Sequence, residues 1–382
     1  MKGDCSVART IEDWHGLLAI FSVLIMDRLF TIHAHSPSAV QGALTPNVWD
    51  LHPEFLGLPK DRIIFEGRIR PLYLRIETVN FCNNDCIICA YSDQTRPKKH
   101  MPRAIFEKIL DDYRDMGGGY VSLTPLVGDV LLDRHIRERI DYLRKCDFVS
   151  GIGFTTNAAM AHRFSSRELD RIIGPLQRLS ISIYGLDEGE YEAMARKKTY
   201  SRMVEGIRRI VSAASVPVSL EFRLLKQRAD GFIENWLHNE VGLKADDGRT
   251  FVNSVMMNYA NWGKYDEANR PLPNQAKWFA LQPTKDRPQC LIPLFACIVF
   301  SNGNVSFCPC DNYDDVDEFR LGNVMAQPLS SLYNSDKAKA LWDWPRSGVP
   351  SFCQNCSFHI PLSVLSDRPG ILEDPYQIVG AG

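Results

Sequence analysis

The sequence predicts an α/β protein built on a parallel sheet, either open or curled into a partial barrel. Short runs of β-branched and aromatic residues alternate along the chain with longer segments whose apolar residues recur at helical spacing. The chain has 382 residues, which is enough for two to three domains and a large apolar core. In folds of this class, ligands bind at the carboxyl ends of the strands.

The alternation starts near residue 71 and contains six predicted strands. Each is a short apolar run bounded by polar residues, glycine or proline. The strands are predicted at Tyr73–Ile76, Tyr120–Leu123, Val149–Thr155, Leu179–Tyr184, Val216–Leu225 and Phe251–Met257.

Helices are predicted between these strands from the spacing of their apolar residues. The first is marked by Ile105, Ile109, Leu110, Tyr113 and Met116, and Gly117 ends it. The helices are predicted around residues 105–116, 136–143, 165–173 and 203–211. The third begins with the Ser165 and Glu168 pair of a capping box.

The chain divides into three predicted parts. Residues 1–70 are predicted to be an N-terminal extension, and residues 71–265 carry the strand–helix alternation. Residues 266–382 start with a proline-rich stretch and hold six cysteines with few long periodic segments. We therefore expect a core domain followed by a small cysteine-rich domain and a tail.

Composition and charge exclude several classes of protein. Hydrophobic residues make up 45% and charged residues 24%, and 44 Lys and Arg nearly balance 46 Asp and Glu. Neither a strongly basic nucleic-acid binder nor a charged disordered chain has this balance. The longest apolar run, Leu17–Met26, is ten residues, whereas a membrane helix needs about 20. Acidic residues before this run disfavour a secretory signal, so we expect a cytoplasmic protein.

Cysteine is the most informative residue type in this sequence. Nine of the eleven cysteines fall into groups: Cys82, Cys86 and Cys89; Cys290, Cys297, Cys308 and Cys310; Cys353 and Cys356. A long chain with an odd cysteine count and no secretory signal is unlike a small disulfide-rich secreted protein. Grouped cysteines in a reducing compartment instead indicate thiolate ligands for metal.

The first group has the spacing C-x3-C-x2-C and follows the first predicted strand. Cys82, Cys86 and Cys89 supply three thiolates, which suit three irons of a [4Fe-4S] cluster and leave the fourth iron open for substrate or cofactor. The alternative is a zinc site, which normally needs four Cys or His ligands. His100 is too far along the chain to be the obvious fourth ligand.

This motif and the six strand–helix units resemble the radical S-adenosylmethionine (SAM) enzymes over roughly residues 70–360. The resemblance implies a partial (β/α)6 barrel in which SAM chelates the open iron through its amino and carboxylate groups. It also implies reductive cleavage of SAM to a 5′-deoxyadenosyl radical that abstracts a substrate hydrogen. An external electron donor such as flavodoxin or ferredoxin is implied as a partner.

Further family motifs suggest residues that bind SAM. Gly128 and Asp129 stand where the family has a Gly-Gly-Glu turn that binds the SAM amino group, although one glycine is missing and Asp replaces Glu. Asn157 and Ser182 lie at strand ends that line the SAM ribose and methionyl group in the family. Arg223 on the fifth strand suits the SAM carboxylate. Ordinary turn and strand-end chemistry is the alternative for each residue.

The second group resembles the SPASM/twitch domain found at the C-terminus of such enzymes. Cys290, Gly303 and Cys308 have the spacing C-x12-G-x4-C, and Cys353 and Cys356 follow as C-x2-C. Asn302-Gly303 predicts a hairpin turn between two strands. Too few cysteines follow Cys308 for the two clusters of a full SPASM domain, so one auxiliary [4Fe-4S] cluster is expected.

We expect Cys290, Cys308, Cys353 and Cys356 to hold this auxiliary cluster. Cys297 and Cys310 remain as substitute ligands or as thiols near the substrate. A structural zinc ion is the alternative occupant, because four cysteines ending in C-x2-C also suit zinc.

From these resemblances we expect an oxidoreductase that dehydrogenates a small polyol-type or peptide substrate, with the auxiliary cluster as electron acceptor. Epimerisation is an alternative, with Cys310 or Cys297 returning a hydrogen atom to the substrate. Peptide maturation is another. A non-catalytic zinc-binding scaffold is the alternative of a different class. No nucleic-acid or membrane partner is expected.

Overall fold

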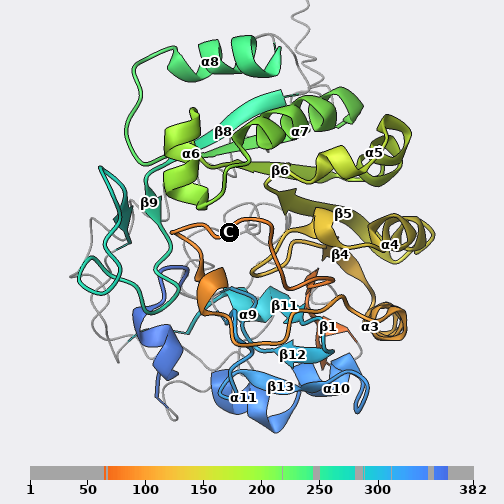
Figure 1. Cartoon of the computed structure of the whole chain (residues 1–382). Coiled ribbons are helices and arrows are strands. Elements are labelled where there is room, and N and C mark those ends of the chain that lie inside the picture. The colour runs from red at the N-terminus through yellow and green to blue at the C-terminus, as the bar shows by residue number, and fades with distance from the viewer. Residues whose placement is uncertain are drawn as a thin grey trace, which may run out of the picture.

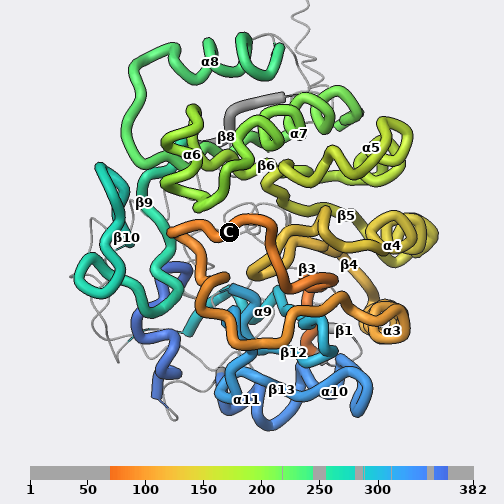
Figure 2. Tube along the Cα trace, in the orientation of Figure 1, coloured from red at the N-terminus to blue at the C-terminus, as the bar shows by residue number. Residues whose placement is uncertain are grey.

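The computed structural model describes residues 64–65, 68–216, 218–243, 250–279, 287, 289–310, 312–342 and 348–359 (Figures 1 and 2). Nearly all of the predicted N-terminal extension therefore lies outside the described residues, as does the end of the predicted tail.

A nine-stranded sheet forms the centre of the molecule, in the order β13-β12-β11-β3-β4-β5-β6-β7-β8. Its strands are β3 (Tyr73–Ile76), β4 (Gly119–Ser122), β5 (Val149–Thr156), β6 (Arg178–Ile183), β7 (Val218–Arg223), β8 (Thr250–Met256), β11 (Ala296–Val299), β12 (Asn304–Ser306) and β13 (Arg320–Asn323). The six strands β3 to β8 pair in parallel and in chain order. This confirms the predicted α/β fold class and each of the six strands, with ends shifted by at most two residues.

Two small strand pairs lie outside this sheet. They are the antiparallel pair β1 (Ile64–Phe65) and β2 (Arg68–Ile69), and the parallel pair β9 (Asn258–Tyr259) and β10 (Lys277–Trp278).

Helices connect the parallel strands and cover the outside of the curved sheet, where α3, α4, α5 and α7 form the outer layer in Figure 1. The helices are α3 (Arg103–Asp115), α4 (Ile136–Leu143), α5 (Ser166–Ile173), α6 (Glu188–Ala195), α7 (Tyr200–Ala213), α8 (Phe232–Trp236), α9 (Ile292–Phe295), α10 (Leu329–Tyr333) and α11 (Asp336–Trp342). Shorter 3-10 or π turns are η3 (Ala90–Asp93), η4 (Val130–Leu132), η5 (Ala161–Arg163), η6 (Leu237–Val241) and η7 (Ser351–Asn355). Among the described residues, no helix has the length and apolar character needed to cross a membrane.

Two sequence signals that predict these helices, a capping box and an apolar stripe, are seen as contacts in the structure. At the start of α5, the Ser165 hydroxyl accepts a hydrogen bond from the backbone of Glu168, and the Glu168 carboxylate accepts one from the backbone of Ser165. In α3 the predicted apolar stripe, including Ile109, Leu110 and Tyr113, is buried. The capping box and the stripe therefore fix where the helix begins and which face packs on the sheet.

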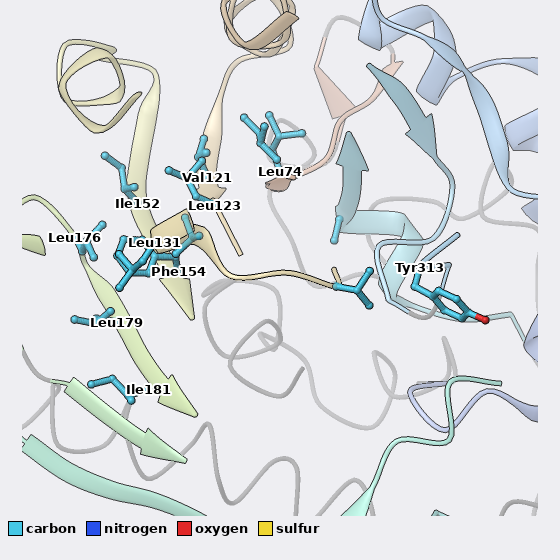
Figure 3. Packing of buried hydrophobic residues seen from close by; sticks show 14 of the residues in the cluster. Leu74, Val121, Leu123, Leu131, Ile152, Phe154, Leu176, Leu179, Ile181 and Tyr313 are labelled. Carbon is cyan, nitrogen blue, oxygen red and sulfur yellow. The ribbon is translucent and has the colours of Figure 1, made fainter. Parts of the chain in front are cut away.

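The core lies between the sheet and its outer helices (Figure 3). Leu74, Val121 and Ile152 occupy paired positions on β3, β4 and β5, and all three are buried. Leu179 and Ile181 continue this layer on β6. Successive side chains of a strand point to opposite faces, so the neighbouring residues on these strands face the inside of the curved sheet.

The cysteine-rich region extends the same sheet. β11 pairs in parallel with β3, and in this register Ala296 lies beside Tyr73 and Cys297 beside Leu74. β11 and β12 form the predicted antiparallel hairpin, with Gly303 at a φ of +89° in its turn. The cysteines that follow β11 and β12 are therefore carried to the edge of the barrel next to its first strand.

Candidate active site

A cavity of about 300 Å³ lies at the carboxyl ends of the parallel strands. Residues from the loops after β3, β4 and β5, from β6 and β7, and from the segment after β8 line it. The structure brings together here nine of the residues singled out from the sequence: Cys82, Cys86, Cys89, Gly128, Asp129, Asn157, Ser182, Arg223 and Cys310. Its size is at the lower end of the range for small-molecule sites.

The loop that carries the first three cysteines is fixed by contacts at several points. The backbone amides of Asp85 and Ile87 donate to the carbonyls of Ala195 and Met194, at 3.0 and 2.9 Å, at the end of α6. In Figure 2 the loop is the orange segment beside α6. The indole of Trp262 donates to the carbonyl of Ile88 over 2.9 Å. These contacts hold the cysteine backbone without using the thiols.

A buried ion pair joins the two ends of this loop. Glu77, just after β3, accepts two hydrogen bonds from the guanidinium of Arg96, at 2.6 and 2.9 Å. Glu77 is fully buried, and it also accepts a hydrogen bond from the backbone of Ser301 over 3.3 Å. The pair thus joins the cysteine loop to the hairpin of the cysteine-rich region.

Cys86 is buried and Cys82 and Cys89 are partly buried, and loss of solvent around the three thiols raises their pKa values. The pKa of Cys89 is raised to about 11, and those of Cys82 and Cys86 are raised further. The proton must leave when a thiolate binds metal, so a bound cation has to supply the stabilisation that the protein alone does not. Within the described ranges, no three Cys, His, Asp or Glu side chains converge on a position for a single metal ion. Three sulfurs around a cavity suit a cluster of several irons.

Gly128 and Asp129 form a tight turn against the cysteine loop. A Cβ atom on Gly128 would lie 3.1 Å from the carbonyl oxygens of Val79 and Phe81, so the close approach of the two backbones favours glycine. The backbone amide of Asp129 donates to the Phe81 carbonyl over 3.1 Å. This turn therefore helps to position the residues that lead into Cys82.

Both carboxylate oxygens of Asp129 accept hydrogen bonds from the protein. The donors are the Thr156 hydroxyl at 2.9 and 3.0 Å, the backbone amide of Asn157 at 2.7 Å and that of Leu131 at 2.9 Å. Burial nevertheless raises the pKa of Asp129 to about 6. The residue joins the end of β5 to the turn after β4, and its charge is not matched by a basic side chain in the ion pairs that the structure describes.

Ser182 and Arg223 meet at Glu221 on the opposite wall of the cavity. The guanidinium of Arg223 donates to the Glu221 carboxylate over 2.7 Å, and the Ser182 hydroxyl donates to the same oxygen over 3.4 Å. The Nε of Arg223 is buried and has no hydrogen-bond partner in the part of the chain that the structure describes. Glu221 was not predicted from the sequence; its signal is a charged residue two positions before Arg223 on the same face of β7.

The second group of cysteines gathers around a smaller cavity, of about 20 Å³. Cys290, Cys308, Cys353 and Cys356 all line it, and Cys310 joins them. Local contacts position these cysteines. The Ser306 hydroxyl accepts a hydrogen bond from the backbone amide of Cys308 over 3.3 Å, and Cys353 lies in η7, directly after which the chain reaches Cys356. The structure thus places the four expected ligands of the auxiliary cluster together.

Arg287 lies beside these cysteines. Its guanidinium donates to the carbonyl of Cys356 over 2.7 Å, and Cys356, Cys353 and Cys290 act on it electrostatically. Burial lowers the pKa of Arg287. A cation here suits a group of thiolates. Arg287 was not predicted from the sequence because the surrounding proline-rich stretch has no periodic pattern.

The two cavities are neighbours. Cys310, His359, Phe358 and Ile292 line both of them. Pro309 also lines the larger cavity, and its carbonyl accepts a hydrogen bond from Arg75 over 2.8 Å. A group held by the second set of cysteines therefore borders the cavity that contains the first set.

Cys297 is placed differently from the other grouped cysteines. It lies in β11 beside Leu74, on the face of the sheet that packs in the core, and it is fully buried. It lines neither cavity. Burial alone raises the pKa of its thiol well above the ordinary value, as expected for a small core residue.

Two models of known families match the chain. The radical SAM superfamily matches residues 76–221, and SPASM, an iron–sulfur cluster-binding domain, matches residues 290–357. The first match covers the cysteine loop and the strands around the larger cavity. The second covers all the cysteines around the smaller cavity.

Curated relatives include two proteins named GTP 3′,8-cyclase. That of Thermodesulfovibrio yellowstonii is 29% identical over 168 residues, or 43% of this chain and 51% of the relative. That of Alkaliphilus oremlandii is 25% identical over 193 residues, or 50% of this chain and 59% of the relative. The chain thus spans about half the length of the curated relatives it matches.

Similar solved structures include native anSMEcpe with bound AdoMet and Kp18Cys peptide. It is 14% identical, has a TM-score of 0.50, and covers 81% of this chain and 98% of its own. At this level of identity the likeness concerns the fold alone.

Proposed function

The chain is a radical SAM enzyme with a C-terminal SPASM domain, and from this premise we propose that it oxidises its substrate by two electrons. The two domains imply a SAM-binding [4Fe-4S] cluster, an auxiliary cluster and SAM itself. The observation that carries the proposal is the shared wall of the two cavities, formed in part by Cys310 and His359.

Cys82, Cys86 and Cys89 are proposed to hold the SAM-binding cluster. Their number fits a cluster with one open iron, and all three residues line the larger cavity. When bound, this cluster and SAM supply a radical that removes a hydrogen atom from the substrate. The chain positions the cluster through the contacts of the loop with α6 and Trp262.

Five further residues are proposed to shape the SAM site. Gly128 lets the turn after β4 approach the cysteine loop, and the Asp129 charge suits the SAM ammonium group. Asn157 points its amide toward the cysteines, and Ser182 lies beside the Glu221 carboxylate. The buried Nε of Arg223 is an available donor for a carboxylate. All five line the cavity.

Cys290, Cys308, Cys353 and Cys356 are proposed to hold the auxiliary cluster. Such a cluster would accept the electron that a deprotonated substrate radical gives up, leaving a product oxidised by two electrons. Arg287 places a positive charge beside these cysteines, which favours the reduced and more negative state of a bound cluster. The substrate class proposed is a small polyol-type molecule or a peptide.

Epimerisation is the second candidate, and the position of Cys310 favours it. Cys310 lines the larger cavity and is not one of the four expected cluster ligands. A thiol at this place is suited to return a hydrogen atom to a substrate radical. GTP cyclisation is a further candidate, because relatives matching about half of the chain carry that name.

Turnover in heavy water separates the first two candidates. Candidate polyols and peptides, with GTP as a third probe, are incubated with anaerobically reconstituted enzyme, SAM and dithionite. Oxidation gives a product lighter by two hydrogens, with SAM consumed once per turnover. A product with the formula of the substrate but one carbon-bound deuterium would indicate epimerisation rather than oxidation. If Cys310 is the hydrogen donor, Cys310→Ala should no longer form this labelled product. Cys146→Ala, a cysteine outside both cavities, is the matched control.

A further inference from the structure

Arg75 faces the larger cavity from the first strand of the barrel. On β3 the side chains of Leu74 and Ile76 are fully buried in the core, whereas Tyr73 and Arg75 line the cavity. The strand neighbours of Arg75 are Ser122 on β4 and Ile298 on β11. Arg75 is therefore on the wall of the cavity that adjoins the cysteine-rich region.

Among the described residues, the guanidinium of Arg75 has no carboxylate partner. Its Nη1 donates to the Pro309 carbonyl over 2.8 Å, and its Nε is buried with no hydrogen-bond partner among the residues that the structure describes. Among the described residues, no Asp or Glu forms an ion pair with it. Two other arginines of the barrel do have such partners: Arg96 pairs with Glu77 at 2.6 Å, and Arg139 pairs with Asp133 at 2.7 Å.

A partly buried cation without a counter-charge is costly unless a ligand supplies one. The guanidinium carries five N–H donors in a planar fork that matches a carboxylate or a phosphate. Only one protein acceptor is described for it, so donors remain for a ligand in the cavity. The geometry favours an oxyanion as that ligand.

SAM is not the best match for this position. The residues proposed to contact SAM lie on or after β4, β5, β6 and β7, and Arg223 already offers a guanidinium on β7. Arg75 lies at the other end of this row of strands, anchored to Pro309 between Cys308 and Cys310. A ligand bound there lies on the side of the cavity next to the second group of cysteines.

We propose that the substrate carries an oxyanion, either a carboxylate or a phosphate, and that Arg75 binds it. This inference rests on the proposed function, because it takes this cavity as the substrate site. Anchoring an anionic group at Arg75 holds the rest of the molecule between the two groups of cysteines. Arg75 is thereby a specificity-determining residue, which narrows the polyol and peptide classes to their acidic or phosphorylated members.

Binding of simple anions tests the proposal without knowledge of the substrate. Inorganic phosphate and acetate are titrated calorimetrically into anaerobically reconstituted, SAM-loaded enzyme. We expect saturable binding in the millimolar range for at least one of them, weakened at least about tenfold in Arg75→Gln and less in Arg75→Lys. Arg167→Gln is the matched control, because Arg167 is exposed on α5 and lines neither cavity. No saturable binding up to about 100 mM, or binding unchanged in Arg75→Gln, overturns the proposal.

Matched pairs of probes identify the anion. Gluconate is compared with glucitol, and glucose 6-phosphate with glucose, in the same titration. Tighter binding of gluconate than of glucitol indicates that the site prefers a carboxylate. Tighter binding of glucose 6-phosphate than of glucose indicates that it prefers a phosphate. Equal binding within both pairs contradicts the proposal.

A parallel assay keeps this proposal separate from the proposed function. SAM affinity and 5′-deoxyadenosine formation are measured on the same samples. If Arg75→Gln loses SAM affinity but retains anion binding, Arg75 serves SAM and the inference is wrong. If wild type forms no 5′-deoxyadenosine, the proposed function fails, whereas the anion titration still reports on Arg75.

Discussion

The side-chain amide of Asn157 donates a hydrogen bond to the sulfur of Cys82, with 3.6 Å between Nδ2 and Sγ. The backbone amide of Asn84 donates to the same sulfur over 3.4 Å. Asn157 itself is held by a reciprocal amide pair with Asn83 and by its backbone contact with Asp129. The end of β5 is thus connected directly to a proposed cluster ligand.

Removing this hydrogen bond should lower the midpoint potential of the SAM-binding cluster. Hydrogen bonds to cluster sulfurs stabilise the reduced, more negative state. One bond is worth about 1 kcal/mol, so we expect Asn157→Leu to lower the potential by tens of millivolts. Redox titration followed by electron paramagnetic resonance measures this change. The auxiliary cluster is the internal control, and an equal shift of both clusters would show a general rather than a local effect.

Replacing Cys82, Cys86 and Cys89 together by Ala should abolish SAM cleavage and leave the auxiliary cluster in place. All three line the larger cavity, and none lines the smaller one. The variant should retain about four irons and form no 5′-deoxyadenosine with dithionite. Measurable 5′-deoxyadenosine from the reconstituted variant would contradict the assignment.

Neutralising Arg287 should lower the midpoint potential of the auxiliary cluster. Its guanidinium contacts the Cys356 carbonyl beside the proposed ligands. Loss of a partly buried positive charge disfavours the added electron, so Arg287→Gln should lower the potential by tens of millivolts. The SAM-binding cluster should be unaffected. An unchanged auxiliary potential, with full iron content, would show that Arg287 has no electrostatic role.

Asp129 should make the stability of SAM-free enzyme depend on pH. Burial raises the pKa of Asp129 from 3.8 to about 6. The protonated carboxyl therefore contributes fully to the stability of the folded state below the unfolded-state pKa of 3.8, and this contribution is lost as pH rises through about 6. Relative to Asp129→Asn, wild type should lose on the order of 1 kcal/mol of unfolding free energy between pH 5 and pH 8. Denaturant titrations of both proteins measure this. A difference that is constant across this range would show that Asp129 has an ordinary pKa.

The six parallel strands and their helices were predictable because their signals are local. Apolar runs, helical spacing and the capping box at Ser165 each lie within a few residues. Helix α6 was not predicted; its start is fixed by the side chain of Asp187, but no apolar stripe marks it. The pairing of β11 with β3 joins strands more than 200 residues apart, and a single sequence contains no local signal for it.

The cysteine motifs were predictable for the same reason, whereas the charges around them were not. Spacing in the sequence grouped Cys297 with the neighbouring cysteines. Side chains of β11 point alternately to the two faces of the sheet, however, and that of Cys297 lies on the core face beside Leu74. Arg75 does carry a signal, as a charged residue at an inward position of a buried strand. Its significance depends on the absence of a carboxylate partner in the described structure, which only the fold reveals.

Metal analysis of anaerobically reconstituted protein, combined with electron paramagnetic resonance, tests the central claim most directly. We expect about eight irons per chain, in two [4Fe-4S] clusters, with the signal of one cluster alone changing when SAM is added. A colourless protein with zinc, or about four irons whose signal SAM does not change, would contradict it.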